Sequence, residues 1–334
     1  DQNLILLDNA TVYNPSHHFC FFSSLNSDAV DNMTIYKSSM PSHYGGRLSS
    51  VLDVTTRDGN LRNYTFSGSI GLISSKLTFE GPIQKDRSSF ILSARRTYAD
   101  ALGRLAGLEA VKSTTLYFYD LNLKLSYILS DKDKITLSAY NGKDKLGVSD
   151  ITSFDWGNSV ASLKWNHIFS PKASSTTSLT VTDYTYNVEV DLTSEFTVES
   201  HLTDYNLNQE FSFYPNDKHA IKAGFSSIYR RSVPNKMESN DPSTILVDPF
   251  ANRYSLEKAV FASDNIKLSD PLELSLGLRF NIASVLGGGS FYEYGENQQI
   301  EKEIITKKNK FFKTYLNLEP RISLAYQLND VSSM

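Results

Sequence analysis

The sequence predicts an antiparallel β-barrel that crosses a membrane, preceded by a small unit of mixed α and β structure. Beyond about residue 60, apolar and polar residues alternate along one segment after another. Several of these segments are longer than the ~5–6 residues typical of soluble strands. Their connections are mostly short at one end and long at the other, as in barrels that cross a membrane. The composition agrees, because 19 Tyr and 19 Phe favour strands over helices.

The first residues predict a small α+β unit. Leu4–Leu7, Met33–Lys37 and Val51–Thr56 have the pattern of short strands. Asn26–Val30 has the polar start of a short helix, with Asn26 or Ser27 as the N-cap residue. Pro and Gly residues interrupt the connections between these segments, as expected of loops.

From about residue 64 the chain predicts strands long enough for the ~9–11 residues of a membrane-crossing strand. In segment 115–129 one face carries Tyr117 and Leu121, and the other carries Asp120 and Lys124. Tyr residues near both ends of a leucine stripe are typical of the aromatic girdles at membrane interfaces. Segment 255–268 does not fit this pattern cleanly. Twelve strands are predicted, over 64–73, 76–83, 89–97, 115–129, 134–143, 158–169, 174–190, 200–214, 219–232, 255–268, 272–283 and 311–328.

The predicted connections are sorted by length. Short turns are expected at 81–88, 130–133, 170–173, 215–217 and 269–271, and mostly long connections near 98–114, 144–157, 191–199, 233–254 and 284–310. Outer-membrane barrels have short periplasmic turns and longer extracellular loops. A soluble antiparallel sandwich also alternates and is the alternative. It gives no reason for this sorting of the loops or for full charges of both signs on the polar faces.

Composition and motifs argue against several classes of function. The net charge is −4 with no block of five like charges, so no nucleic-acid partner is predicted. The single cysteine, Cys20, builds neither a disulfide framework nor a Cys-based metal site. No G-x-S-x-G, H-E-x-x-H or P-loop motif occurs, so we predict no enzyme and no cofactor. The pair His17-His18 is interpreted as part of a loop and not as a metal site.

The N-terminal stretch carries a more specific signal. Segments 7–19, 31–37 and 41–54 resemble successive parts of the plug in TonB-dependent receptors of the Bacteroidota type, and Leu318-Glu319-Pro320-Arg321 resembles a strand motif of their barrels. The resemblance implies that 1–60 is the C-terminal part of a plug domain. It also implies that 61–334 is the N-terminal half of the transmembrane β-barrel, with about 12 of ~22 strands. The sequence departs from the family pattern at Cys20, Ser38, Ser39 and His43, where we expect Gly, a Gly pair and Arg.

This resemblance implies active import of a scarce nutrient, such as a siderophore, cobalamin or a glycan, across the bacterial outer membrane. The implied partners are the outer-membrane lipid bilayer and the nutrient itself, and the resemblance leaves open whether a surface lipoprotein lies over the barrel. A further partner is the TonB–ExbB–ExbD energy complex, reached through an N-terminal segment that this sequence does not contain. The alternatives are a surface binding or adhesion protein anchored by its barrel, and a soluble β-sandwich carbohydrate-active protein.

Two sets of site residues follow from the family layout. Substrate is expected at plug residues His17, His18 and Phe19 and at Tyr98, Phe154, Trp156, Tyr292 and Tyr294 in extracellular loops, because aromatic rings suit sugars and hydrophobic chelates alike. A charge buried in a filled lumen needs a partner. Contacts between plug and barrel wall are therefore expected at Arg47, Glu80, Arg95, Asp120, Lys124, Glu210, Arg279, Glu319 and Arg321.

Overall fold

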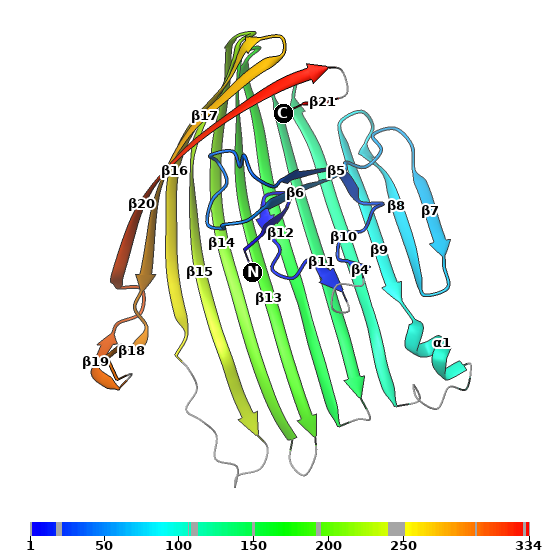
Figure 1. The fold of residues 1–334 in the computed structure, drawn as a ribbon. Coiled ribbons are helices and arrows are strands. Elements are labelled where there is room, and N and C mark those ends of the chain that lie inside the picture. Colours follow the sequence, from blue (N-terminus) through cyan, green and yellow to red (C-terminus); the bar gives the residue numbers. More distant parts are fainter. Residues whose placement is uncertain are drawn as a thin grey trace.

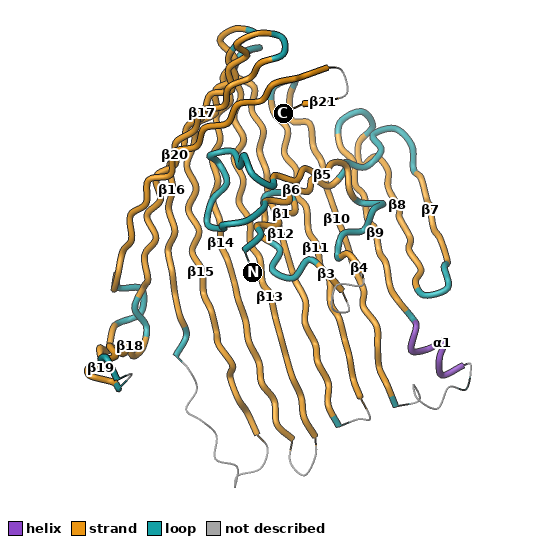
Figure 2. Tube along the Cα trace, viewed as in Figure 1, coloured by secondary structure: helices purple, strands orange, loops and turns teal. Residues whose placement is uncertain are grey.

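A long curved sheet holds a small sheet against its hollow face (Figure 1). This computed structural model describes residues 2–17, 22–105, 107, 113–148, 151–191, 195–239, 251–297, 299–329 and 332–333. Figure 2 shows strands almost throughout, and the helix α1 (Ala99–Leu105) follows the third long strand. Among the described residues there is no helix with the length and apolarity needed to cross a membrane.

The curved sheet, called the wall below, is antiparallel and follows chain order, so each strand pairs with its sequence neighbours. It runs β21-β20-β17-β16-β15-β14-β13-β12-β11-β10-β9-β8-β7. The bounds are β7 (Thr65–Ile70), β8 (Ser74–Gln84), β9 (Ser88–Thr97), β10 (Thr114–Ser130), β11 (Asp133–Val148), β12 (Thr152–Ser170), β13 (Ala173–Asp191), β14 (Glu195–Asn216), β15 (His219–Ser239), β16 (Arg253–Ser269), β17 (Leu272–Leu286), β20 (Phe311–Asn329) and β21 (Ser332–Ser333). The twelve predicted strands correspond to β7–β17 and β20.

Polar side chains face the hollow of the wall and apolar side chains face outward. On β10, Asp120 is 1% exposed and Lys124 is 7% exposed, whereas Leu121 on the opposite face is 44% exposed. A soluble sandwich packs its apolar face inside. An apolar outer band around a polar interior is the arrangement that a lipid bilayer requires. The structure therefore confirms the membrane barrel and not the sandwich.

Two of the predicted long loops are wrong. β11 ends at Val148 and β12 begins at Thr152, so the predicted loop 144–157 is mostly strand. Likewise β13 and β14 leave only 192–194 between them, where the prediction was 191–199. In the hairpin of β11 and β12, Lys143 and Asp155 are paired at 3.2 Å on the part that extends beyond the predicted strands. Such charges end the apolar stripe, but they do not end the ladder of hydrogen bonds.

The long connections that remain are 98–113, 240–252 and 287–310, and the strand ends that they join all lie at one end of the wall (Figure 1). At the other end the connections are short, such as 131–132, 171–172, 217–218 and 270–271. The connection 287–310 contains a hairpin of its own, β18 (Gly289–Tyr294) paired with β19 (Ile300–Thr306). The sorting of connections by length is thus confirmed, with fewer long loops than predicted.

Residues 2–60, called the N-terminal unit, contain the small sheet. Its strand order is β2-β1-β6-β5, and a separate pair is formed by β3 and β4. The bounds are β1 (Leu4–Leu7), β2 (Ala10–Thr11), β3 (Ser16–His17), β4 (Phe22–Ser23), β5 (Val30–Tyr36) and β6 (Val51–Thr56). Asp8 and Asn9 join β1 to β2 with φ of 48° and 73°, the left-handed conformations that a type I′ hairpin turn requires.

The helix predicted at Asn26–Val30 is wrong. The Ala29 amide donates to the Asn26 carbonyl at 3.0 Å, and the Asn26 side-chain oxygen accepts from the Asp28 amide at 3.1 Å. This side-chain bond makes an Asx turn, and β5 begins directly after it at Val30. Asn26 therefore closes a turn instead of capping a helix.

The N-terminal unit and the wall share one apolar core. Leu7, Val12 and Val54 of the unit pack with Tyr140 of β11 and Val160 of β12, each no more than 6% exposed. Tyr140 and Val160 are apolar residues on the mostly polar inner face of the wall. They mark the place where the unit sits, and the polar contacts described next surround this core.

Candidate functional site

His17, at the end of β3, lies between two carboxylates of the wall. Its Nε2 is 2.6 Å from Asp120 Oδ1 of β10, and its Nδ1 is 2.6 Å from Asp144 Oδ2 of β11. The three side chains are at most 3% exposed. Both ring nitrogens therefore act as donors, which only the imidazolium form permits. Burial opposes this charge, but the hydrogen bonds to Asp120 and Asp144 outweigh it and raise the pKa of His17 above its ordinary value.

Asp120 is the centre of a larger buried network. Arg95 Nε of β9 donates to Asp120 Oδ2 at 2.6 Å, and the Tyr140 hydroxyl donates to Asp120 Oδ1 at 2.9 Å. The second guanidinium arm of Arg95 donates to the carbonyl of Ser23 in β4 at 2.5 Å. A buried carboxylate is tolerated when its oxygens are satisfied in this way. We call His17, Asp120, Asp144 and Arg95 the His17 cluster.

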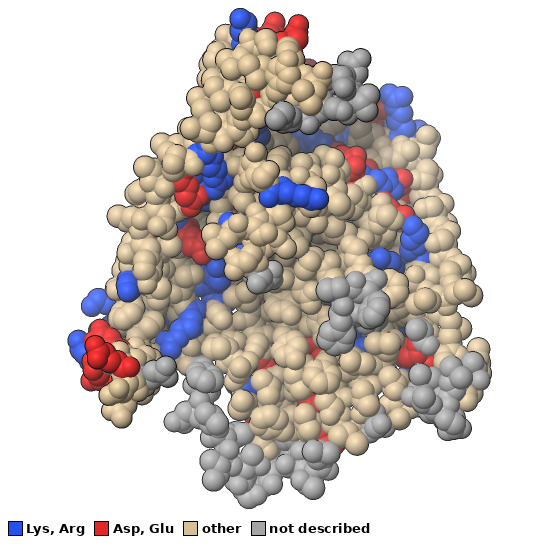
Figure 3. All heavy atoms as spheres, viewed as in Figure 1, with Lys and Arg blue, Asp and Glu red and all other residues tan. Residues whose placement is uncertain are grey.

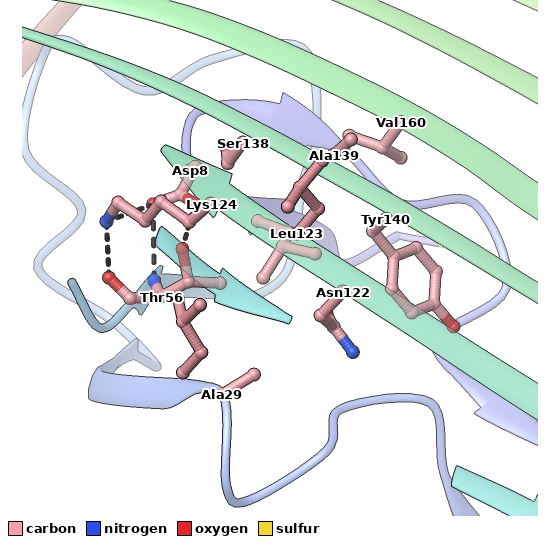
Figure 4. A pocket seen from close by; sticks show the side chains of 12 residues that line it. Asp8, Ala29, Thr56, Asn122, Leu123, Lys124, Ser138, Ala139, Tyr140 and Val160 are labelled. Carbon is pink, nitrogen blue, oxygen red and sulfur yellow. Dashed lines mark hydrogen bonds and ion pairs between the residues drawn. The ribbon is translucent and has the colours of Figure 1, made fainter. Parts of the chain in front are cut away.

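A second contact lies at the other end of the unit's sheet. Lys124 Nζ donates to the carbonyl of Thr56 at 2.5 Å (Figure 4). The same nitrogen lies 3.4 Å from Asp58 Oδ1. In Figure 4, Asp8 lies beside the same lysine, and its carboxylate accepts from the Thr56 amide at 3.2 Å. Burial of Asp58 opposes its charge, but hydrogen bonds from Lys134 and Ser126 lower the pKa of its carboxyl. This cluster fixes the chain where it leaves the small sheet.

A third contact joins Tyr13 to strands β14, β15 and β16. Arg230 forms a bidentate pair with Asp204, with distances of 2.8 and 3.1 Å, and its other arm is 3.0 Å from Glu257. The Tyr13 hydroxyl donates to Asp204, and burial raises the pKa of Tyr13 well above its usual range. The sequence analysis missed this contact. The only indication of it in the sequence was that Asp204 lies on the polar face of the strand predicted at 200–214.

In a fourth contact, two wall arginines hold the backbone of residues 40–45. Arg279 Nη1 donates to the His43 carbonyl at 3.0 Å, and Arg321 Nη1 donates to the carbonyls of Pro41 and Tyr44 at 2.6 and 2.8 Å. A Cβ atom on Gly45 would lie 2.4 Å from Arg279 Nε, so a larger residue at this position would displace the Arg279 side chain. Burial lowers the pKa of His43 to about 4, so its ring is neutral at neutral pH.

Most of the predicted contact residues do touch the N-terminal unit. Arg95, Asp120, Lys124, Arg279 and Arg321 do so as described, and Glu80 accepts from Arg57 Nη1 at 2.7 Å. The others make different contacts. Glu210 pairs with Lys222 at 2.9 Å and Glu319 with Arg321 at 2.6 Å, both within the wall, and Arg47 donates to the neighbouring Gly46 carbonyl. In Figure 3 charged side chains of both signs lie near one another around the unit.

The predicted substrate residues are not brought together. His17 is buried against the wall, Tyr98 donates its hydroxyl to the Gly71 carbonyl, and His18 and Phe19 lie outside the described residues. Phe154 and Trp156 lie within β12 and not in a loop, and Trp156 is 5% exposed. Tyr292 and Tyr294 are exposed on β18, which Figure 2 shows at the edge of the wall, apart from β3. No group of three or more His, Cys, Asp or Glu side chains in the described ranges is placed to hold a metal ion.

The fold and these contacts define an outer-membrane β-barrel with a folded unit in its hollow. Residues 42–333 match the family model described as TonB dependent receptor-like, beta-barrel, and the chain belongs to this family. No curated protein sequence matches the chain.

Solved structures agree on the fold. The siderophore receptor PirA from Acinetobacter baumannii and the alcaligin outer-membrane receptor FauA from Bordetella pertussis each match with a TM-score of 0.68 and 14% identity, over 98% of this chain and 52% of theirs. The copper transporter OprC matches with a TM-score of 0.68 and 11% identity, over 98% of this chain and 53% of its own. The chain therefore spans about half the length of the structures it matches.

Proposed function

We propose that this chain is part of an active importer of the bacterial outer membrane, driven by the TonB complex. The observation that carries the proposal is the N-terminal unit seated in the hollow of a polar-lined wall. Buried ion pairs such as that of His17 with Asp120 and Asp144 fix it there. A folded unit in this place closes a pore, and a pore that is closed by a separate unit needs energy to open.

In this proposal residues 1–60 are the C-terminal part of the plug and 61–334 are the N-terminal half of the barrel. The small sheet of residues 2–60 and the wall that begins with β7 at Thr65 support this division. We also propose the Bacteroidota type, on the resemblance of segments 7–19, 31–37 and 41–54. The partners are then the TonB–ExbB–ExbD complex, the nutrient and a surface lipoprotein over the long connections.

The substrate belongs to the proposal and is kept broad. The solved structures that match include a siderophore receptor and a copper transporter, and scarce nutrients of this kind are the class we propose. Of the substrate residues predicted from the sequence, Tyr292 and Tyr294 on β18 are exposed within a long connection and are available for a first encounter with such a ligand. His17 belongs instead to the contact that holds the unit.

Uptake tests the proposal. The protein is expressed from its own gene in a Gram-negative host with and without tonB, and accumulation of radiolabelled ferric siderophores, cobalamin and oligosaccharides is measured. Accumulation of one of these that requires both the protein and tonB is the expected result. Binding to cells without any tonB-dependent accumulation would instead establish the alternative, a surface binding or adhesion protein anchored by its barrel.

A further inference from the structure

Three cationic side chains lie on the outer face of the wall, near the end that carries the long connections. Arg230 of β15 points inward to Asp204, so the next residue, Arg231, points outward. Lys258 of β16 and Lys308 of the connection before β20 lie on this face too. All three residues are exposed, and none of them has a hydrogen bond or an ion pair with a residue in the described ranges.

The connection before β20 lies against a row of tyrosines on this face. The Tyr229 hydroxyl of β15 donates to Asn309 Oδ1 at 2.9 Å, and Lys308 Nζ lies 5.2 Å from the centre of the Tyr254 ring of β16. The ring of Tyr229 lies 6.3 Å from that of Tyr254 and 6.4 Å from that of Tyr205 of β14. Tyrosine rows on the outer face of a barrel mark the membrane interface.

The strand register places the other two cations on either side of this row. Arg231 is the direct partner of Tyr254, toward the long connections. Lys258 is the partner of Ser227, which lies two residues from Tyr229 toward the short turns and so inside the apolar band. The levels of Arg231 and Lys258 are therefore ~13 Å apart along the strand. Two long cationic side chains can close this distance from both ends, over the Tyr229 ring.

The protein itself offers no anion for these cations. In the register, Asp183 and Glu257 are the nearest carboxylates, and both already have partners. Asp183 of β13 accepts from Thr203 Oγ1 at 2.7 Å, and Glu257 points inward to Arg230. A cation on the lipid-facing side of a barrel is destabilising by itself. The position of Lys258 therefore favours an anionic group that comes from the membrane.

An apolar groove begins beside the same cations. It has a volume of about 470 Å³ and crosses the outer face of β11–β15. Ala161 and Leu163 of β12 line one part of it, and Ser227 and Tyr229 line the part at β15. Because Ser227 is the strand partner of Lys258, the groove ends next to this lysine. Such a groove suits one hydrocarbon chain whose polar headgroup lies at the cations.

We propose that the outer face of β11–β16 binds one lipid of the extracellular leaflet that carries a phosphate monoester. The phosphate lies among Arg231, Lys258 and Lys308, and one acyl chain lies in the groove beside Ser227. Long connections face outward from the cell in barrels of this kind, which places the cations in that leaflet. Arg and Lys both bind phosphate well. A monoester carries close to two negative charges at neutral pH, so three cations suit it better than they suit a phosphodiester.

Native mass spectrometry tests the site on the protein expressed from its own gene and purified in detergent. The probe is monophosphoryl lipid A, and the comparison is the same lipid after removal of its phosphate. We expect one retained molecule of the phosphorylated lipid, bound about tenfold more tightly than the dephosphorylated one. Equal binding of the two lipids would overturn the phosphate site. Equal binding of dioleoylphosphatidylglycerol, a phosphodiester, would overturn the choice of a monoester.

Single substitutions separate the site from a general attraction of anions. Lys258→Gln and Arg231→Gln should each weaken binding of the phosphorylated lipid about tenfold and leave binding of the dephosphorylated lipid unchanged. Arg96→Gln is the matched control. Arg96 of β9 is also an exposed arginine on the outer face, 5.0 Å from the centre of the Tyr117 ring, but it does not adjoin the groove. An equal loss with Arg96→Gln would show that binding follows net charge alone, and the site would be refuted.

The groove is tested without any change of charge. Ala161→Leu fills part of the groove and should weaken binding of both lipids about threefold or more, because the acyl chain loses contact area. Ala94→Leu, on the outer face of β9 and outside the groove, should have no effect. Heat-modifiable migration on gels shows that each variant is a folded barrel. Unchanged binding to Ala161→Leu would overturn the acyl-chain groove, and no part of this test depends on whether the protein imports anything.

Discussion

Replacing His17 by Ala should loosen the N-terminal unit from the wall more than any other single change at this surface. The substitution leaves Asp144 without its imidazolium partner and removes one of the cations beside Asp120. Breaking a buried pair by removing one partner costs about 3–5 kcal/mol. With an m value of ~1–2 kcal/mol/M in urea, the midpoint for release of the unit should fall by at least about 1.5 M.

The protein carries its own probe for this measurement. It has two tryptophans. Trp156 is 5% exposed on the inner face of β12, close to the unit, whereas Trp165 is 45% exposed on the outer face. In a Trp165→Phe background, the fluorescence of Trp156 should report release of the unit in detergent while the barrel stays folded.

His167→Ala is the matched control. His167 lies 2.6 Å from Asp133, the same distance as in the His17 pairs, but these two side chains are 25% and 24% exposed. Solvent screens such a pair, so the urea midpoint should not change measurably. Equal shifts for the two variants, or no shift for His17→Ala, would refute the reasoning that burial decides the strength of the contact.

The pH gives the same prediction a second test. The pKa of His17 is raised in the folded protein, so the stability that the charged ring contributes is fully present below the ordinary pKa of 6.5. That contribution is lost as the pH rises through the raised pKa. The difference in urea midpoint between the wild type and His17→Ala should therefore become smaller at alkaline pH. A difference that stays constant from acid to alkaline pH would contradict the imidazolium form.

Three further predictions concern other positions. Because burial lowers the pKa of His43 from 6.5 to about 4, the unfolded state binds more protons between these values, and the wild type should lose stability as the pH falls through this window; urea titrations of His43→Gln should lack that loss. Leu163→Arg places a charge on the outer face near the middle of β12 and should cost ~2–4 kcal/mol in unfolding from lipid vesicles, whereas Ser153→Arg, on the same face beside the first residue of the strand, should cost less. Gly45→Ala should displace Arg279 from the His43 carbonyl and cost about 1–3 kcal/mol in the urea midpoint, and a neutral result would contradict the close packing there.

The strands of the wall could be predicted from the sequence because lipid imposes a strict period of two. That rule assigns Asp120 and Lys124 to the inner face without any knowledge of their partners. The ends of the hairpins were harder to predict. Lys143 and Asp155 interrupt the apolar stripe there, while the hydrogen-bonded pairing of β11 with β12 continues. β16 was harder still. Ala259 and Phe261 face inward beside the N-terminal unit, and Lys258 and Asp264 lie on the outer face, so both faces of this strand are mixed.

The partners of the inner charges could not be predicted, because they are set by contacts between residues far apart in the sequence. His17 meets Asp120 and Asp144, which lie 103 and 127 positions away. An alternating pattern shows which way a side chain points, but not the height at which the N-terminal unit sits in the barrel. Aromatic character did not show where a side chain lies, for the same reason. Trp156 packs inside the wall, and its sequence context is no different from that of an exposed loop aromatic.

The same inner charges also specify the register of the wall. A slip of one residue between β10 and its neighbours would turn Asp120 and Lys124 toward the lipid, because the side-chain period of a strand is two. A cation on the lipid face costs ~2–4 kcal/mol at the bilayer midplane, and the carboxylate would also lose His17 and Arg95. Contacts with the N-terminal unit extend from Glu80 on β8 to Arg321 on β20. The unit can therefore dock fully only on a wall whose strands are all in register, so its docking reports correct assembly of the barrel.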